Sequence, residues 1–413
     1  MAQLRSATTS PIVPLLGHER TNRGGRNWLA IDPFGSSVAR SRRPCYRPEM
    51  VPIKAAPRRA WWAWAYPLLA WLVLLVSYFI GTGSSLFVAV ASMVLIATVF
   101  AAVHHAEVVA HRTGEPFGTH VLALAVTVIE TALIVSAMIA APAENAALAR
   151  DTIFAAVMIV CNGIVGSCFL WGGIHHHEQA FRLQGASAAL AVLTALTVLT
   201  LVLPNFATTN PGPGFSTSQL MFAGAVSLAF YCSFIFAQTV RHRDYFLPMD
   251  GDEDEEHTPP PSAKIAVGSA GLLLVALVAI VGLAKTLTPT VEASVLHLGM
   301  PRAVVGITIA ALVLLPEGLA AVRAAQANRL QTSLNLALGS SLATIGLTIP
   351  AVAAASIVLG QPLELGLDPK EQVLLVLTLL VSVITLSTGR TTVLQGTIHL
   401  LIFAVFLFFA VVP

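Results

Sequence analysis

The chain alternates long apolar runs with short polar breaks from residue 61 to its end. A helix of about 20 residues crosses the hydrocarbon core of a bilayer, and it satisfies its own backbone hydrogen bonds there. The pattern therefore predicts an all-α polytopic membrane protein with about 11 transmembrane helices. We expect these spans near residues 61–80, 84–103, 119–141, 152–174, 187–204, 218–240, 265–285, 302–324, 332–357, 371–388 and 393–412.

The composition strengthens this interpretation. Of the 413 residues, 56% are hydrophobic and 11% are charged, whereas a soluble domain carries about 25% charged residues. So many apolar runs could not all be buried inside one soluble domain, and this class is excluded. The four cysteines show no spacing typical of disulfides or metal sites, and we interpret them as small hydrophobic residues.

The first 60 residues differ from the rest of the chain. They carry eleven Lys and Arg residues against three acids, and they lack a hydrophobic period. Such a segment is predicted to be disordered and cytoplasmic, although a basic, acid-poor start is also typical of organellar transit peptides.

The basic residues also orient the spans. If the N-terminus lies in the cytoplasm, eight basic residues after position 60 fall on the inside and four fall on the outside. Short cytoplasmic loops carry an excess of Lys and Arg in membrane proteins. We therefore expect a cytoplasmic N-terminus and a C-terminus outside.

Two carboxylates lie deep inside predicted spans. Glu130 is in the third span and Glu317 is in the eighth, and no Lys or Arg lies at a comparable depth. A charge at the bilayer centre costs about 2.5–3.5 kcal/mol on insertion scales, so such residues are functional candidates by default. The alternative is a protonated Glu that donates a hydrogen bond between helices.

The two glutamates are five spans apart, and each is followed by a span rich in small residues. Because five is an odd number, the second copy must enter the membrane from the opposite side. Inverted repeats of this kind are typical of secondary transporters, whose sites lie near the midplane between the repeats.

Oxygen-bearing residues accompany each glutamate. Thr127 shares a helix face with Glu130, and Pro316 leaves a carbonyl oxygen without its helical donor directly before Glu317. Oxygen atoms suit a hard cation such as Ca²⁺. We expect Glu130 and Glu317 to bind the cation or protons, with supporting positions at Thr127, Asn162, Pro316, Ser340 and Ser341.

The blocks "GEPFGTHVLALAVTVIETALIVSAMI" with "DTIFAAVMIVCNGIVG", and "VVGITIAALVLLPEGLAAVRAAQANRLQTSLNLALGSSLATIGLTIP", resemble the two α-repeats of the calcium/cation antiporter superfamily. The branch most similar is the bacterial ChaA-type calcium/proton antiporters. Many relatives carry G-N-A-x-E at the glutamate, and this chain instead carries V-T-V-I-E and L-L-P-E-G.

The resemblance implies one leading helix and two inverted five-helix repeats in the bacterial inner (plasma) membrane. The domains expected are a basic segment 1–60, a first helix with the first repeat over 61–243, an acidic cytoplasmic linker 244–264, and a second repeat over 265–413. The implied activity is exchange of a cation for protons by alternating access. Ca²⁺ is the favoured cation, and an Na⁺/H⁺ or K⁺/H⁺ antiporter on the same fold is the alternative. A cation channel is a less favoured function.

Other polar residues near the third span are candidates for proton entry or regulation, namely His104, His105, Glu107 and Glu115. The run "DGDEDEEH" lacks the glycine and acid order of an EF-hand and fits a solvated linker. No HExxH, GxSxG or P-loop motif is present. We therefore expect a transporter and not an enzyme, with no cofactor, no nucleic-acid partner and an oligomeric state left open.

Overall fold

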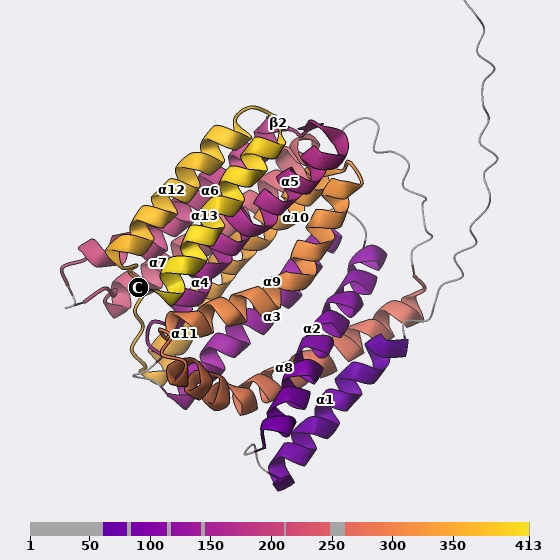
Figure 1. Ribbon diagram of the computed structural model, residues 1–413, viewed down its shortest axis with the longest axis vertical. Coiled ribbons are helices and arrows are strands. Elements are labelled where there is room, and N and C mark those ends of the chain that lie inside the picture. Colours follow the sequence, from indigo (N-terminus) through magenta and orange to yellow (C-terminus); the bar gives the residue numbers. More distant parts are fainter. Residues whose placement is uncertain are drawn as a thin grey trace, which may run out of the picture. The chain divides into compact units, whose positions relative to one another are not determined.

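The computed structural model describes residues 61–80, 84–113, 117–141, 145–209, 212–247 and 261–412 (Figure 1). All of them belong to one compact unit, Arg59–Pro413. The basic segment 1–60, Glu115 and the acidic run 250–257 lie outside the described residues, so the predictions about them stay predictions.

The described part of the chain contains eleven helices that are long and apolar enough to cross a membrane. This confirms the predicted fold class. The spans are α1 (Trp61–Ile80), α2 (Ser85–Thr113), α3 (Phe117–Ala140), α4–η1–α5 (Leu148–Met158, Ile159–Ile164, Val165–His176), α6–η2–η3 (Leu183–Thr197, Val198–Val202, Leu203–Phe206), α7–η4 (Thr217–Phe236, Ala237–Arg241), α8 (Ala263–His297), α9 (Ala303–Gln326), α10–η6–α11 (Leu330–Ala343, Thr344–Thr348, Ile349–Leu359), α12 (Pro369–Leu386) and α13 (Val393–Val411).

Two helices continue well past their predicted ends. The second span was expected to end near residue 103 and ends at Thr113, and the seventh was expected to end near 285 and ends at His297. Hydropathy marks the part of a helix that can lie in hydrocarbon, and polar residues can continue the same helix beyond it. For α8 the end comes just before Gly299, whose φ of 70° is the left-handed conformation typical after a helix.

A short strand pair is a small departure from an all-helical chain. Strand β1 (Gln179–Ala180) pairs antiparallel with β2 (Arg390–Thr391). The pair joins the loop after α5 to the loop before α13, so it ties the two halves of the chain together at one end of the bundle.

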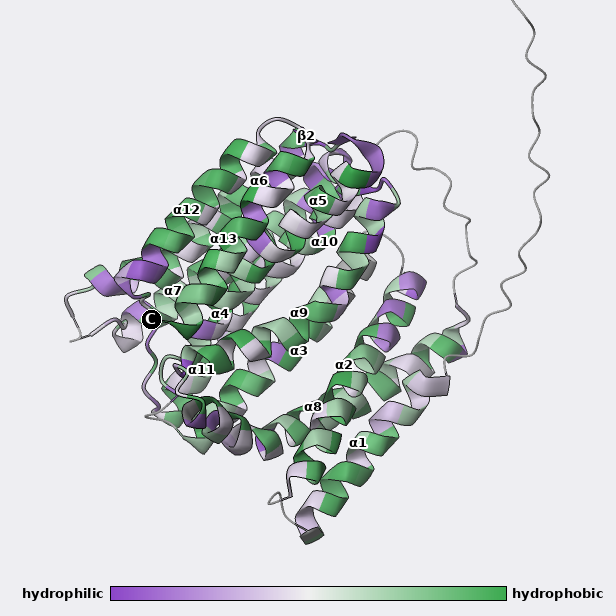
Figure 2. Cartoon of the chain, viewed as in Figure 1, coloured by the Kyte–Doolittle hydropathy of each residue, from purple (hydrophilic) through white to green (hydrophobic). Residues whose placement is uncertain are grey.

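Apolar side chains face both inward and outward. Figure 2 shows hydrophobic positions over most of the helices, and large residues such as Leu72, Phe222 and Leu380 are exposed. Inside, one buried cluster joins α1, α2, α3 and α8, and a larger one joins the remaining spans. Helix α9 contributes Val313 to the first and Leu314 to the second, so the helix that carries Glu317 lies between the two clusters.

The last helix of each predicted repeat packs against the broken span of the other repeat. Helix α7 lies on η6 and α11, and α13 lies on η1 and α5. Both contacts are close because of glycines: a Cβ at Gly346 would lie 2.6 Å from the Cβ of Tyr231, and one at Gly166 would lie 2.9 Å from the Cβ of His399. This reciprocal packing is consistent with two related halves, and their inverted relation stays a prediction.

Candidate functional site

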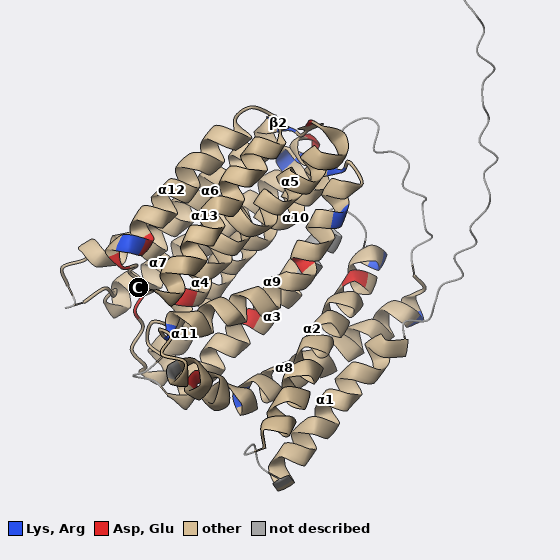
Figure 3. Cartoon of the chain, viewed as in Figure 1, with Lys and Arg blue, Asp and Glu red and all other residues tan. Residues whose placement is uncertain are grey.

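Glu130 lies in the middle of α3 and is almost completely buried, with 2% of its surface exposed. Figure 3 shows this acidic position on α3 and another on the neighbouring α9, away from the charged ends of the helices. Both carboxyl oxygens of Glu130 are buried, and neither has a hydrogen-bond partner among the described residues. Buried polar groups are normally hydrogen-bonded, so the carboxyl oxygens of Glu130 are available to accept a hydrogen bond or to bind a cation.

The polar neighbours of Glu130 come from η6, a π-helical turn. Thr344 and Thr348 are one turn apart on η6, and both are close enough to interact with the carboxyl group. The hydroxyl group of Thr131 on α3 donates to that of Thr348 at 3.3 Å. The hydroxyl oxygens of Thr344 and Ser341 are themselves buried without a partner in the described part of the chain. Unpaired oxygen atoms therefore gather on both sides of the contact between α3 and η6.

Glu317 lies in α9, is 3% exposed, and has a different environment. The hydroxyl group of Ser340 on α10 donates a short hydrogen bond to its carboxylate. Helix α9 continues through Pro316, directly before the glutamate. Glu317 and Glu130 are close enough to repel each other when both are ionised. The structure thus brings together the two glutamates that the sequence singled out.

A hollow lies beside Glu317 and Ser340. It is lined by residues of α3, α7, η4 and α10, among them Ala123, Gln238 and Asn335. The residues that line it include no Lys or Arg, and Glu317 is the charged group among them. The hollow is therefore compatible with a cation.

The predicted supporting residues differ in whether they contact a glutamate. Ser340 contacts Glu317, and Ser341 is buried in the same helix with an unpaired hydroxyl group. Thr127 is buried one turn before Glu130, but its hydroxyl group donates to the carbonyl of Ala123 at 2.9 Å.

Asn162 belongs to a separate polar network. Its amide nitrogen donates to the hydroxyl group of Thr378 at 2.8 Å, and its amide oxygen lies 3.2 Å from Nδ1 of His399. Nε2 of His399 lies 2.9 Å from the hydroxyl oxygen of Thr385. These buried groups join η1 to α12 and α13, so the amide of Asn162 is used for packing between helices and does not contact either glutamate. Its predicted supporting role is not tested by these contacts.

The histidines predicted to serve proton entry pack on α1. Nε2 of His105 lies 2.9 Å from the carbonyl oxygen of Ala63, and the ring of His104 lies 5.2 Å from that of Trp62. Glu107 is exposed on α2 and is close enough to Arg323 of α9 to interact electrostatically. Their predicted roles stay predictions.

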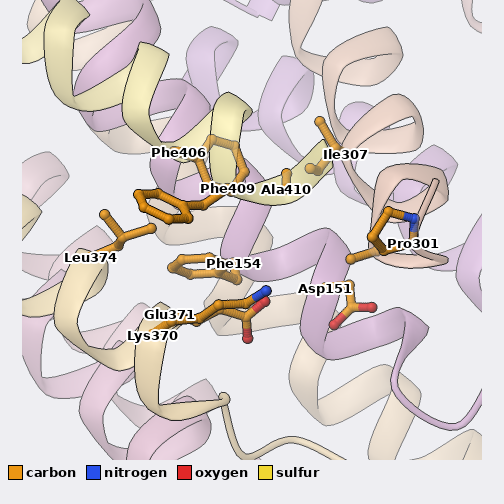
Figure 4. Close-up of a pocket in the computed structure, with 11 residues that line it drawn as sticks. Asp151, Phe154, Pro301, Ile307, Lys370, Glu371, Leu374, Phe406, Phe409 and Ala410 are labelled. Carbon is orange, nitrogen blue, oxygen red and sulfur yellow. The ribbon is translucent and has the colours of Figure 1, made fainter. Parts of the chain in front are cut away.

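A second hollow lies at the end of the bundle away from β1 and β2, where α4 begins and α13 ends (Figure 4). Asp151, Lys370 and Glu371 line it together with the rings of Phe154, Phe406 and Phe409. Asp151 is buried and paired with Arg150 at 2.8 Å. Sequence reasoning placed Asp151 at the end of a span and missed this pair, because adjacent residues give no pattern of their own.

Sequence reasoning also did not assign Thr348, Gln238 and Asn335. Thr344 and Thr348 have the four-residue spacing of one helix face, which could have indicated a polar face on the ninth span. Gln238 gave no such signal, since it comes near Glu317 only because η4 and α9 line the same hollow. Among the described residues no group of three His, Cys, Asp or Glu side chains could hold a metal ion. A cation here would therefore depend on two carboxylates with hydroxyl and carbonyl oxygens.

Comparison with known proteins gives consistent matches. The family model for the sodium/calcium exchanger protein matches residues 69–240 and 268–412. A putative ionic transporter, y4hA, of Sinorhizobium fredii is 48% identical over 85% of this chain and 96% of its own length. The sodium-potassium/proton antiporter ChaA of Escherichia coli is 36% identical over 83% of this chain and 94% of its own length.

Solved structures share the fold. The structure of native YfkE has a TM-score of 0.65 at 16% identity, over 85% of this chain and all of the other. The crystal structure of the H⁺/Ca²⁺ exchanger CAX has a TM-score of 0.63 at 13% identity, over 84% of this chain and 88% of the other. Together with the family model, these likenesses confirm the resemblance to calcium/cation antiporters: the chain is an integral membrane protein of the sodium/calcium exchanger family, a family of transporters.

Proposed function

We propose that this protein exchanges Ca²⁺ for protons across the bacterial inner membrane, with Glu130 and Glu317 as the groups that bind either ion. The observation that carries the proposal is the pair of buried carboxylates on two helices. They lie close enough to repel each other, and neither forms an ion pair with a described Lys or Arg. Two carboxylates match the charge of one divalent cation or of two protons.

The exchange follows from competition for the same oxygen atoms. Burial favours the protonated, neutral form of a carboxyl group, and a bound cation favours the ionised form. Ca²⁺ takes six to eight oxygen ligands with flexible geometry. The unpaired oxygens of Glu130, Thr344 and Ser341, with the carboxylate of Glu317, supply part of such a set. Proton and cation therefore exclude each other, which couples their opposite movements.

Alternating access requires two halves that move relative to each other. We assign α1 as the leading helix, α2–α7 as the first repeat and α8–α13 as the second, joined by the linker 244–264. The reciprocal packing of α7 on η6 and of α13 on η1 supports this division. The excess of basic residues supports an N-terminus in the cytoplasm and a C-terminus outside.

Exchange of Na⁺ or K⁺ for protons is the second candidate. It is favoured by the 36% identity to a protein named as a sodium-potassium/proton antiporter. A third relative, 25% identical over 60% of this chain, is named as a Ca²⁺/H⁺ antiporter of Aphanothece halophytica. The same carboxylate pair serves both candidates, so the choice between them depends on the number and spacing of the remaining oxygen ligands.

The test uses the full chain in proteoliposomes that contain a pH-sensitive dye. Ca²⁺, Na⁺ and K⁺ are added separately to the outside at equal ionic strength, and proton movement is followed. We expect the largest response to Ca²⁺, and none in a double variant with Glu130→Gln and Glu317→Gln. The matched control is Glu178→Gln, at an exposed glutamate that pairs with Arg390 in the short strand region.

Three results would contradict parts of the proposal. A larger response to Na⁺ or K⁺ than to Ca²⁺ would replace the cation. Full exchange by the double variant would remove the glutamates from the site. A cation current without proton movement would indicate a channel.

A further inference from the structure

A glycine at the centre of α10 has no packing reason to be a glycine. A Cβ built on Gly339 would meet no atom within 4 Å. Glycine in a helix lowers its stability relative to alanine, so this position gives up helix stability without gaining a close contact. Gly339 lines the hollow beside Glu317 and directly precedes Ser340. Because Gly339 has no side chain, there is open space next to Ser340 and the carboxylate of Glu317.

The hollow extends away from the glutamate. A third hollow shares Gly339, Asn335, Gln238 and Phe234 with the hollow beside Glu317, so these two adjoin. The third hollow continues to Gln331 at the start of α10 and to Gly185 at the start of α6. It therefore leads from the middle of the bundle to the end that holds β1 and β2.

One wall of this space is polar and held in place. Nε2 of Gln331 donates to Oδ1 of Asn335 at 2.9 Å, and Nδ2 of Asn335 donates to the carbonyl of Phe246 at 2.6 Å. Gln238 lies across from them on η4, a π-helical turn, and π-turns are frequent at functional sites. Amide oxygens along such a wall can take the place of water around a cation as it loses its hydration shell.

The opposite end of the bundle differs. The hollow there is lined by Phe154 and Phe406, whose ring centroids are 5.5 Å apart, and neither Glu130 nor Glu317 lines it (Figure 4). Of the three hollows described for these residues, the one that reaches a glutamate adjoins the space that extends toward the end with β1 and β2.

We propose that the space lined by Gly339, Gln238 and Asn335 is the route by which the cation and protons reach Glu317 from the end of the bundle that holds β1 and β2. Gly339 keeps the route open, and Gln238 and Asn335 line it as positioning residues for the entering ion. The proposal rests on the proposed function for the identity of the ion, and on geometry alone for the existence of the route.

The first experiment measures the route without using transport. Gly339→Cys and Gln238→Cys are made in a chain with Cys45→Ser and Cys232→Ser, because Cys161 and Cys168 are buried and Cys232 is exposed. Inside-out and right-side-out vesicles are treated with a membrane-impermeant cationic thiol reagent. In inside-out vesicles the cytoplasmic end of the bundle, which carries β1, β2 and the excess of basic residues, faces the reagent. We expect labelling at both positions to be at least tenfold faster there.

The matched control is Gly271→Cys. Gly271 is also a helical glycine with nothing within 4 Å of a built Cβ, but it is exposed on the apolar α8 and lines neither hollow. We expect no labelling there from either side. Labelling of Gly339→Cys no faster than of Gly271→Cys, or faster only in right-side-out vesicles, would overturn the route.

The second experiment measures the effect on exchange. Gly339→Leu should reduce the exchange rate at least tenfold by filling the space, and Gly271→Leu should leave it unchanged. Gln238→Leu should raise the KM for the cation severalfold with little change in kcat, and Gln238→Asn should restore part of the difference. Wild-type exchange in Gly339→Leu would overturn the role of that glycine.

The two proposals can fail separately. If the wild-type chain moves no Ca²⁺, Na⁺ or K⁺ but Gly339→Cys is labelled from one side, the route stands and the proposed function fails. If the wild-type chain exchanges ions and Gly339→Cys is not labelled, the function stands and the route fails.

Discussion

Glu130 and Glu317 occupy corresponding places in the sequence but different environments in the structure. Glu317 accepts a hydrogen bond from Ser340 and lines the hollow that we propose as the start of the ion route. Glu130 faces Thr344 and Thr348 of η6, has no hydrogen-bond partner in the described part of the chain, and lines none of the three hollows described for this chain. On the proposed route, Glu317 is therefore the accessible carboxylate and Glu130 the enclosed one.

The difference indicates how the pair could divide its work. An accessible carboxylate next to a hydroxyl donor can exchange its ion with water at low cost. A buried carboxylate whose oxygens have no hydrogen-bond partner among the described residues gains more from a bound ion than one that already accepts a hydrogen bond. Matched substitutions at the two positions test whether this difference matters for exchange.

The largest effect is expected from shortening each acid by one methylene group. In Glu130→Asp the carboxylate withdraws from η6, and nothing enclosed with it can move to fill the gap. Because a displacement of about 1 Å can cost about 100-fold in rate, we expect a loss of that size. Glu317→Asp should lose about tenfold, because water in the hollow can bridge the gap. Exchange rates in proteoliposomes measure both, and a larger loss in Glu317→Asp would reverse the assignment.

The second largest effect is expected from the pH of the solution that contacts Glu317, which should change the KM for the cation. Since cation and proton compete, the KM for the cation should rise as pH falls, by about tenfold per pH unit for each proton displaced. The effect should be strong when pH is lowered on the side to which the hollow leads and weak on the other side. An equal response from both sides would contradict one-sided access to Glu317.

Removal of the hydroxyl group that contacts Glu317 should have a smaller effect. A hydrogen bond to a charged group contributes about 1.5–3 kcal/mol, and about 1.4 kcal/mol is a factor of ten, so Ser340→Ala should raise the KM for the cation by about tenfold or more. The neighbour Ser341, whose hydroxyl group is buried without a partner, is the matched control. If Ser341→Ala has the larger effect, the hydroxyl group of Ser341 and not that of Ser340 contacts the ion.

Thr344→Val tests the enclosed carboxylate. It removes a buried hydroxyl group that has no partner among the described residues, so the protein should become more stable by about 1 kcal/mol. At the same time the KM for the cation should rise about threefold, since one oxygen near Glu130 is lost. Thermal unfolding in detergent and exchange rates are measured on the same preparation. Stabilisation with unchanged KM would place Thr344 outside the site.

The smallest effect on exchange is expected from Asn162→Ala. This change removes the amide that pairs with Thr378 and with Nδ1 of His399, which should lower stability by about 1–3 kcal/mol. Exchange by the folded protein should stay near the wild-type level, because the amide does not contact either glutamate. A loss of cation affinity as large as that of Ser340→Ala would return Asn162 to the site.

Much of the fold could be read from hydropathy, because a helix in a bilayer must be apolar over about 20 residues. That requirement located all eleven spans. It failed at the ends of α2 and α8, where the helix continues into polar sequence up to Thr113 and His297. It also could not indicate that several spans contain a π-turn, as at η1 and η6, because the apolar run is the same length with or without one.

The candidate site also has features that the sequence predicts and features that it does not. Glu130 and Glu317 were evident because a carboxylate in hydrocarbon is costly wherever the helices pack. Ser340, which follows Glu317 in the next span of the predicted repeat, does contact it, and its supporting role stays a prediction. Asn162 has the same polarity and depth, yet its contacts are with α12 and α13. Polarity shows that a group needs a partner, and does not show which helix provides it.

The sequence by itself determined that this protein crosses the membrane about eleven times and buries two glutamates, because the cost of placing polar groups in lipid acts on each span separately. The packing of the helices sets which glutamate lines a hollow, which hydroxyl groups face each one, and that Gly339 lies beside open space next to Glu317. Those features depend on residues far apart in the chain, such as Gln238 and Asn335, which line one hollow from positions 97 residues apart, and Thr131 and Thr348, whose hydroxyl groups are hydrogen-bonded. A local pattern carries no information about such contacts until the helices are packed.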